Sequence, residues 1–212
     1  MTLSLKNVTI GYSAPLVSTI DAELVSGDFV CLVGRNGTGK STLLKTIAGL
    51  IPPLTGEVSA TKEVAIVLTQ VPDLPNTTVF ELVSYGRIPY LNLFAKLREE
   101  DKKAVTEAIE TVGIKELTNR KISQLSDGEK QKAMIARALA QGSEILLLDE
   151  PSAFLDYPSK HELMSLLKNL AHEKNKAILL STHDLDLVNK YADKVWEVKD
   201  HLFRQSLRPM AN

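Results

Sequence analysis

Alternation of apolar and polar residues marks several short strands in the first third of the chain. Residues 3–10 (Leu-Ser-Leu-Lys-Asn-Val-Thr-Ile) alternate in this way, and another alternating stretch lies between Pro15 and Gly27. A Pro-rich break over residues 50–55 is followed by two further strand-like stretches, 56–59 and 64–68. A period of two is typical of strands with one buried face, so these segments predict an antiparallel β region.

Three apolar runs lack this alternation: Phe29–Val33, Ile145–Leu148 and Ala177–Leu180. Continuous runs of this length are typical of strands that are buried on both faces of a parallel sheet covered by helices. One covering helix face is expected from Leu163, Leu166, Leu167 and Leu170. We therefore predict an α/β fold with a mainly parallel sheet core and an antiparallel β subdomain.

The period becomes helical between Thr77 and Gly113, where an apolar stripe recurs at helical spacing. Ser126–Glu129 then opens a second helix, Lys130–Gln141. These helices predict an inserted helical subdomain over about residues 73–142.

The length of 212 residues suggests one large α/β domain rather than two independent ones. We expect it to cover residues 1–203, with Val195–Val198 as an edge strand and residues 204–212 as a basic C-terminal tail.

A glycine-rich stretch joins the first apolar run to the helix-like segment Leu43–Ala48. It reads Gly34-Arg35-Asn36-Gly37-Thr38-Gly39-Lys40-Ser41-Thr42, which fits the spacing G-x-x-x-x-G-K-[ST]. In such a loop, backbone N–H groups and the N-terminus of the following helix bind an anion. Lys40 reaches the β- and γ-phosphates, and the Ser41 hydroxyl coordinates Mg²⁺. The stretch predicts a nucleoside triphosphate site; an ordinary glycine-rich turn is the alternative.

Polar residues follow four of the predicted strands. Gly34, Gln70, Asp149 and His183 each stand where a strand ends. In open parallel sheets, ligands bind beyond the carboxyl ends of the strands. We therefore expect these four positions to converge on one edge of the sheet.

Composition narrows the possible partners. The chain has 212 residues, with 25 Lys and Arg against 26 Asp and Glu, and a formal net charge of −1. This balance gives no overall field to hold nucleic acid or an anionic membrane. The single cysteine, Cys31, lies in an apolar run and is expected in the core, which suits a reducing, cytosolic setting. Apolar runs stay well short of the ~18 residues that span a bilayer, and the polar start is unlike a signal peptide.

Taken together, the motifs identify a family. The phosphate loop, Gln70, Leu125-Ser-Asp-Gly-Glu129, Ile145–Glu150, Ser152–Asp156 and His183 occur in this order. With them the chain resembles the ATPase subunit of ABC transporters, from about Leu3 to about Asp200. The signature-like Leu125–Glu129 shortly before a hydrophobic Asp-Glu-Pro is the most specific part of this resemblance.

The resemblance implies a P-loop NTPase fold of ABC type and an ATPase that uses ATP and Mg²⁺. By position, Tyr12 matches the aromatic that stacks on adenine, although core packing is the alternative for this residue. Gln70 matches the Q-loop glutamine near Mg²⁺ and the attacking water, and Asp149 matches the Walker B aspartate of the Mg²⁺ shell. Glu150 takes the general-base position, and His183 matches the switch histidine that contacts the γ-phosphate.

The resemblance also implies a head-to-tail homodimer of ATPase subunits, in which the signature acts in trans. Ser126 and the Gly128 backbone are then the expected γ-phosphate donors, and Asp156 matches the D-loop aspartate that bridges to the opposite subunit. The usual signature is Leu-Ser-Gly-Gly-Gln, so Asp127 and Glu129 depart from it. Asp127 places a carboxylate close to a phosphate, which predicts that its side chain points away or that the site is weakened.

A narrower resemblance lies in Val83-Ser-Tyr-Gly-Arg-Ile-Pro-Tyr90, which is similar to a stretch of importer ATPases for iron-siderophores, haem and cobalamin. It implies contact of Arg87 and Tyr90 with integral membrane permease subunits; packing inside the subdomain is the alternative. The chain would then work on the cytoplasmic face of the inner membrane, with a solute-binding protein as an indirect partner and no nucleic acid. A non-transporting ABC ATPase, acting as a mechanical switch on a membrane or nucleoprotein complex, is the rival function. A small-molecule P-loop kinase would have no use for the signature.

Overall fold

The structure is a computed structural model that describes residues 2–69, 74–91 and 96–207. The chain divides into two compact units. The first contains Met1–Thr69, Glu144–Ala153 and Met164–Asn212, and the second contains Gln70–Ser143 and Phe154–Leu163. Residues near Asp156 therefore belong with the helical insertion, although they lie beyond the predicted range of 73–142.

A six-stranded sheet forms the centre of the first unit. Its strands follow the order β5-β6-β7-β3-β8-β9, and every pair is parallel except the antiparallel pair β8 and β9. The continuous apolar runs supply its middle, because every residue of β3, β6 and β7 is buried. The strand bounds are β3 Phe29–Val33, β5 Val64–Val67, β6 Ile145–Asp149, β7 Ala177–Thr182, β8 Lys194–Lys199 and β9 Leu202–Ser206.

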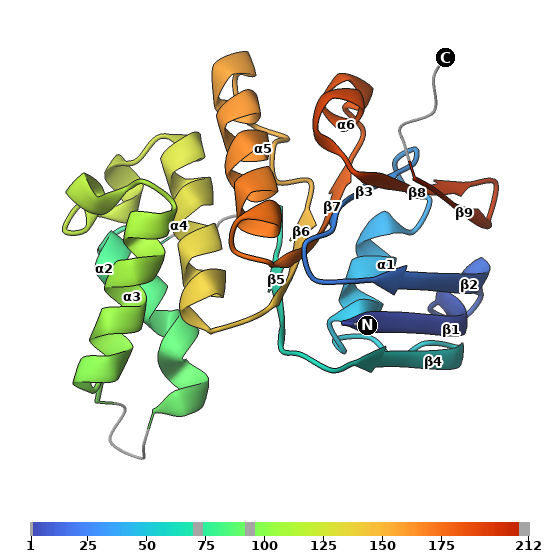
Figure 1. The fold of residues 1–212 in the computed structure, drawn as a ribbon, viewed down its shortest axis with the longest axis horizontal. Helices are drawn as coiled ribbons and strands as arrows, with labels where there is room; N and C mark the ends of the chain where they lie inside the picture. The colour runs from blue at the N-terminus through green and yellow to red at the C-terminus, as the bar shows by residue number, and fades with distance from the viewer. Residues whose placement is uncertain (1, 70–73, 92–95, 208–212) are drawn as a thin grey trace. The chain divides into compact units, whose positions relative to one another are not determined.

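The alternating segments form a separate antiparallel sheet in the same unit, with strand order β2-β1-β4. These strands are β1 (Leu3–Gly11), β2 (Pro15–Leu24) and β4 (Thr55–Ala60). Helix α1 (Lys40–Ile47) lies beside this sheet (Figure 1), and its apolar residues join both sheets in one core. The predicted parallel and antiparallel strands are thus confirmed.

Three helices pack together in the second unit: α2 (Val79–Ser84), α3 (Glu99–Thr111) and α4 (Asp127–Ala140). A 3-10 helix, η1, covers Tyr85–Tyr90, and two short 3-10 turns follow α3, η2 at Lys115–Leu117 and η3 at Ile122–Gln124. Gly86 allows the close approach of η1 to α4, because a Cβ there would collide with the Arg137 carbonyl. The remaining helices are α5 (Tyr157–His172) and α6 (Leu185–Tyr191).

The C-terminal strand corrects two predictions. Val195–Val198 lies in β8, which is flanked by β3 and β9 and is therefore not an edge strand. Arg204, the predicted start of the tail, lies inside β9. Asp200 and His201 both have positive φ, 50° and 63°, and form the tight turn that folds β9 back onto β8. Neither residue is glycine, so the turn leaves little trace in the sequence.

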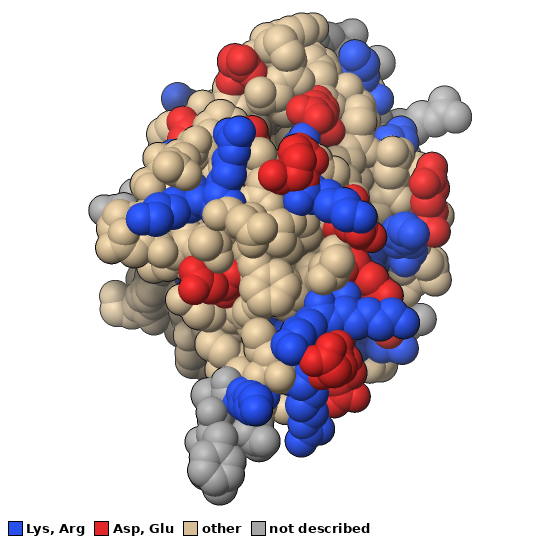
Figure 2. All heavy atoms as spheres, turned by 90° about the vertical axis from the view of Figure 1, so that its left-hand side faces the viewer, with Lys and Arg blue, Asp and Glu red and all other residues tan. Residues whose placement is uncertain are grey.

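Charge is mixed on the face of the molecule that Figure 2 shows. Figure 2 shows Lys and Arg interspersed with Asp and Glu around broad uncharged areas, which agrees with the near-zero net charge. Within the described part of the chain, no helix combines the length and apolar character that crossing a bilayer requires.

Candidate nucleotide site

The glycine-rich loop runs from the end of β3 to the start of α1. Gly39 caps α1 with φ 105°, and Gly37 has φ 81°, so both occupy backbone regions that favour glycine. A Cβ at Gly34 would lie 2.5 Å from the Val198 carbonyl oxygen. Lys40 Nζ donates hydrogen bonds to the carbonyl oxygens of Gly34 at 2.9 Å and Arg35 at 3.4 Å. The ammonium group of Lys40 therefore links the end of the loop to the carbonyl oxygens at its start.

A cavity of about 420 Å³ opens along this loop. Its lining includes Asn36, Ser41 and Thr42 from the loop and helix, Tyr12 from the end of β1, and Glu150. Tyr12 is 61% exposed, so it is not a core aromatic and its ring is free to meet a flat ligand. The cavity is thus lined by phosphate-loop residues and by one exposed aromatic residue.

Three polar side chains meet at the ends of neighbouring strands, next to the loop. Asp149 is the last residue of β6, Glu150 follows it, and His183 follows β7. Strands β6, β7 and β3 are neighbours in the sheet, so their carboxyl ends form one edge. The expected convergence is therefore observed for Gly34, Asp149 and His183. Gln70, the fourth position, lies outside the described residues.

Glu150 occupies a constrained position in this group. Its φ is +47°, a left-handed conformation that costs a residue with a side chain about 1–2 kcal/mol. The carboxylate bridges two basic groups, with Oε2 3.0 Å from Nδ1 of His183 and Oε1 3.5 Å from Nζ of Lys40. Oε1 is buried and has no hydrogen-bond partner among the described residues. A buried carboxylate oxygen without a donor can accept one from a bound molecule.

Two hydroxyl groups hold this edge of the sheet, and the sequence analysis assigned a role to neither. Ser181 donates a hydrogen bond to Asp149 Oδ1 at 2.7 Å and accepts one from the Glu150 backbone N–H at 2.9 Å. Thr69 donates to the Asp149 carbonyl oxygen at 2.8 Å. The sequence signal for these two residues is a hydroxyl group at the end of an apolar run. Such residues are common at strand ends, so the signal does not distinguish a role in a site.

The residues present fit a nucleoside triphosphate with Mg²⁺. The loop offers backbone donors and one ammonium group, Tyr12 lines the cavity, and Glu150 Oε1 lies 3.5 Å from Lys40 Nζ but accepts no hydrogen bond from the described residues. Ser41 and Asp149 supply a hydroxyl and a carboxylate, the hard oxygen ligands that Mg²⁺ prefers. Together these groups suit phosphate and a single divalent cation.

The predicted signature, Leu125–Glu129, lies at the start of α4. Leu125 is buried, and Ser126 caps the helix. The Ser126 hydroxyl accepts from the Glu129 N–H, while the Glu129 carboxylate accepts from the Ser126 backbone N–H at 2.8 Å. Asp127 is exposed, and its carboxylate lies 3.1 Å from Lys130 Nζ. The Asp127 side chain is therefore paired on its own helix, and a Cβ at Gly128 would lie 3.5 Å from the Ser159 hydroxyl oxygen, an ordinary van der Waals contact.

Asp156 lies just before α5, in the second unit. It accepts a hydrogen bond from the Ser159 N–H at 2.9 Å. Hydrogen bonds from the hydroxyl and the backbone N–H of Ser159 hold the pKa of Asp156 below its ordinary value. This carboxylate therefore acts as a helix cap in the isolated chain.

Arg87 and Tyr90, the predicted permease contacts, lie on η1 and are engaged within the second unit. Arg87 Nε donates to Asp101 at 2.9 Å, Nη1 donates to the Ala140 carbonyl, and the guanidinium stacks on Tyr90 at 4.0 Å. Tyr90 Oη donates to the Gln141 carbonyl at 2.7 Å. The exposed apolar side chains of this segment are instead Tyr85 and Ile88, together with 40% of Tyr90.

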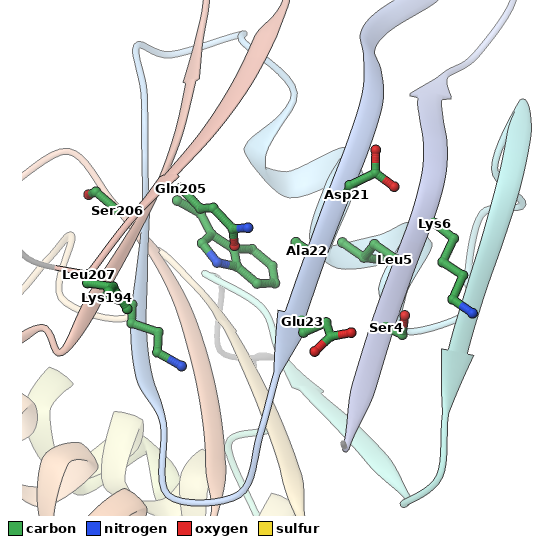
Figure 3. Close-up of a pocket in the computed structure, with 11 residues that line it drawn as sticks. Ser4, Leu5, Lys6, Asp21, Ala22, Glu23, Lys194, Gln205, Ser206 and Leu207 are labelled. Carbon is green, nitrogen blue, oxygen red and sulfur yellow. The ribbon is translucent and has the colours of Figure 1, made fainter.

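A second cavity, of about 490 Å³, lies between β1 and β2 on one side and β8 and β9 on the other (Figure 3). Its charged lining residues are of both signs, and Lys194 already pairs with Asp28 at 2.7 Å. It shares no lining residue with the phosphate-loop cavity. We therefore place the candidate site at the loop.

Comparison with known proteins agrees with this geometry. The ABC transporter family matches residues 17–153. An uncharacterized ABC transporter ATP-binding protein of Methanocaldococcus jannaschii is 43% identical over 94% of this chain and 73% of its own length. The iron(3+)-hydroxamate import ATP-binding protein FhuC of Bacillus subtilis is 38% identical over 90% of this chain and 76% of its own length. The zinc uptake ATP-binding protein ZnuC of Bacillus subtilis is 35% identical over 91% and 89%.

Solved structures give the same result. A structure assigned to a metal-chelate type ABC transporter, in an inward-facing conformation, has a TM-score of 0.92 and 29% identity, with 97% of this chain and 83% of that chain covered. A dimeric bacterial ABC transporter cassette has a TM-score of 0.82 and 28% identity, with 99% and 100% covered. The fold is that of the ABC ATPases, as predicted. The chain belongs to the ABC transporter ATP-binding family.

Proposed function

We propose that this chain is the ATP-hydrolysing subunit of an ABC importer for an iron-siderophore, haem or cobalamin-type substrate. One observation carries the enzymatic part of this proposal. The Glu150 carboxylate lies between Lys40 of the phosphate loop and His183, and the Glu150 backbone has a positive φ. This arrangement supports general-base chemistry beside a phosphate site.

Residues of the phosphate loop and residues at the strand ends have different roles in the proposed hydrolysis. Lys40 exchanges its contacts with loop carbonyls for the β- and γ-phosphates, and Tyr12 stacks on the adenine. Ser41 and Asp149, together with Gln70, would hold Mg²⁺. The ion would supply charge neutralisation to the phosphates. Glu150 Oε1 accepts a proton from the attacking water, and His183 orients the carboxylate and contacts the γ-phosphate.

The signature completes the site of a second copy. We propose that two subunits form a head-to-tail homodimer in which Ser126 and Gly128 of one copy face ATP held by the other. The dimeric cassette among the similar structures supports this arrangement. The Asp127 carboxylate is paired with Lys130 on its own helix, and we expect Asp156 to leave its cap on α5 to meet the partner. Residues 1–203 act as one ATPase domain in this dimer.

Permease contact comes from η1. Its exposed Tyr85, Ile88 and Tyr90 form an apolar surface, which we call the η1 patch. Arg87 supports this patch, because its guanidinium stacks on Tyr90 and pairs with Asp101 of α3. We propose that the patch docks on a membrane permease, so that the subunit lies at the cytoplasmic face of the membrane and serves a solute-binding protein indirectly.

The substrate class rests on relatives. The FhuC similarity and the metal-chelate type neighbour favour a chelated metal, and the ZnuC similarity makes free zinc the competing substrate.

Two assays test this proposal. The purified chain should hydrolyse MgATP, and Lys40→Ala should abolish hydrolysis, because it removes the ammonium group of the loop. The subunit should then be reconstituted with its permease in vesicles that contain a loaded binding protein. Uptake of a ferric siderophore, haem or cobalamin supports the proposed substrate class. ATP-dependent uptake of zinc alone would contradict the substrate class, and an inert wild-type chain would contradict the ATPase.

A further inference from the structure

Ser181 is a buried hydroxyl residue at the end of β7. It follows the apolar run Ala177–Leu180 and is fully buried. In the parallel pairing of β6 and β7 it stands opposite Asp149. On its other side it stands opposite Leu32 of β3, the strand that leads into the phosphate loop. Ser181 therefore lies in the middle of the sheet, between β6 and β3, and pairs with the last residue of β6.

The Ser181 hydroxyl has both of its roles filled by neighbouring candidate site residues. It donates its single proton to Asp149 Oδ1 at 2.7 Å, and it accepts the Glu150 backbone N–H at 2.9 Å. One oxygen atom thus joins the carboxylate that would hold Mg²⁺ to the backbone that carries the proposed base. A side chain without a hydroxyl would leave a buried donor and a buried acceptor unsatisfied at once.

The Glu150 backbone needs this support, because its φ of +47° is unfavourable for a residue with a side chain. Such a conformation persists only where the surroundings determine it from several sides. The Glu150 carbonyl accepts from the Ala153 N–H at 3.1 Å, and the Glu150 N–H is held by Ser181. The carboxylate then reaches His183 and Lys40 from this fixed backbone.

We propose that Ser181 is a positioning residue for hydrolysis: it holds the left-handed backbone of Glu150 and the Oδ1 atom of Asp149 in register. This inference rests on the proposed ATPase function. Ser181 does not touch the cavity, so its removal should misplace the base and leave the nucleotide contacts of the loop in place. If the Ser181 hydroxyl instead only stabilised the core, its removal would lower kcat only by reducing the fraction of folded protein.

The test compares Ser181→Ala with Ser181→Thr, which keeps the hydroxyl. Thr46→Val is the matched control, because it also deletes a buried hydroxyl, one that has no hydrogen-bond partner among the described residues. Three quantities are measured: exchange of the Glu150 amide by NMR without nucleotide, the Kd of a fluorescent ATP analogue, and kcat with KM for MgATP. Ser181→Cys, which keeps the volume but is a weak donor, replaces the alanine variant if that variant does not fold.

We expect Ser181→Ala to speed exchange of the Glu150 amide and to lower kcat about tenfold or more, with Kd and KM changed less than about threefold. Ser181→Thr should restore most of kcat and of the amide protection, and Thr46→Val should match the wild type in both. An amide equally protected in Ser181→Ala, an unchanged kcat, or a loss of Kd as large as the loss of kcat would each overturn the proposal. A wild-type chain without ATPase activity would refute the proposed function instead, and the exchange measurement would still decide whether Ser181 holds Glu150.

Discussion

Glu150 Oε2 lies 3.0 Å from His183 Nδ1, although the two residues are 33 positions apart in the chain. The contact exists because β6 and β7 are parallel neighbours that end within one residue of each other: Asp149, the last residue of β6, pairs with Ser181, and β7 ends at Thr182. His183 is largely exposed, whereas Glu150 is mostly buried. The histidine can therefore move toward a ligand while the carboxylate stays in place, which suits a pair that orients a base beside a phosphate.

Asp127 is the clearest departure from the family signature, and its contact with Lys130 predicts that it is tolerated. We expect Asp127→Gly to hydrolyse ATP at or above the wild-type rate, because it removes a negative charge near the γ-phosphate of the partner copy. Asp127→Asn, which removes the charge but keeps a side chain, should behave alike in turnover. Both variants should lose a little thermal stability, because each removes the Lys130 contact and a negative charge from the first turn of α4, where such a charge is worth about 0.3–1 kcal/mol.

Steady-state kinetics at saturating MgATP, together with thermal melts, measure both effects. A clear loss of turnover in folded Asp127→Gly and Asp127→Asn would show that the carboxylate takes part in the reaction.

The η1 patch and its support predict two different phenotypes. Ile88→Ser should weaken association with the permease and uptake while the melting temperature stays unchanged, because Ile88 is 59% exposed. Arg87→Ala should lower the melting temperature, because it leaves Asp101 buried without its partner. Leu202→Ser alters an aliphatic residue of similar exposure on β9 and is the matched control.

Co-purification with the permease and melting curves separate these variants. If Ile88→Ser retains the permease at the wild-type ratio, the η1 patch is not the docking surface.

Asp101 gives the second unit an acid-sensitive contact. Hydrogen bonds from the Arg98 backbone N–H and from Arg87, with the nearby guanidinium charges, lower the pKa of Asp101. A depressed folded-state pKa stabilises the protein above the unfolded value of about 4, and this contribution is lost as the pH falls through the folded-state pKa. We expect Asp101→Asn to melt below the wild type at pH 7 and the difference to shrink below about pH 4.

Melting curves of both proteins across this range provide the measurement. A difference that stays constant from pH 7 to pH 3 would mean that the charge of Asp101 contributes nothing.

Local patterns predicted the phosphate loop and the strand ends well, because each depends on neighbouring residues. The spacing of the glycines and of Lys40 in Gly34–Thr42 is itself the pattern of a phosphate-binding loop. Asp149 and His183 follow buried parallel strands that are neighbours in the sheet, so both lie at one edge of it. Packing of Arg87 inside the subdomain was an open alternative, but its partner Asp101 was not identified, because it lies 14 positions away on a different helix. The Ser181 bridge was missed for a similar reason: it depends on strand register and on the positive φ of Glu150, which sequence patterns do not reveal.

The central claim, that this chain hydrolyses ATP with Glu150 as the base, is tested most directly by single-turnover hydrolysis in Glu150→Gln. The amide keeps the size of the side chain but cannot take a proton, so MgATP binding should stay near the wild-type value. The hydrolysis rate should fall by a factor on the order of 10² or more, and an ATP-dependent dimer should accumulate. Hydrolysis by folded Glu150→Gln at the wild-type rate would contradict the account.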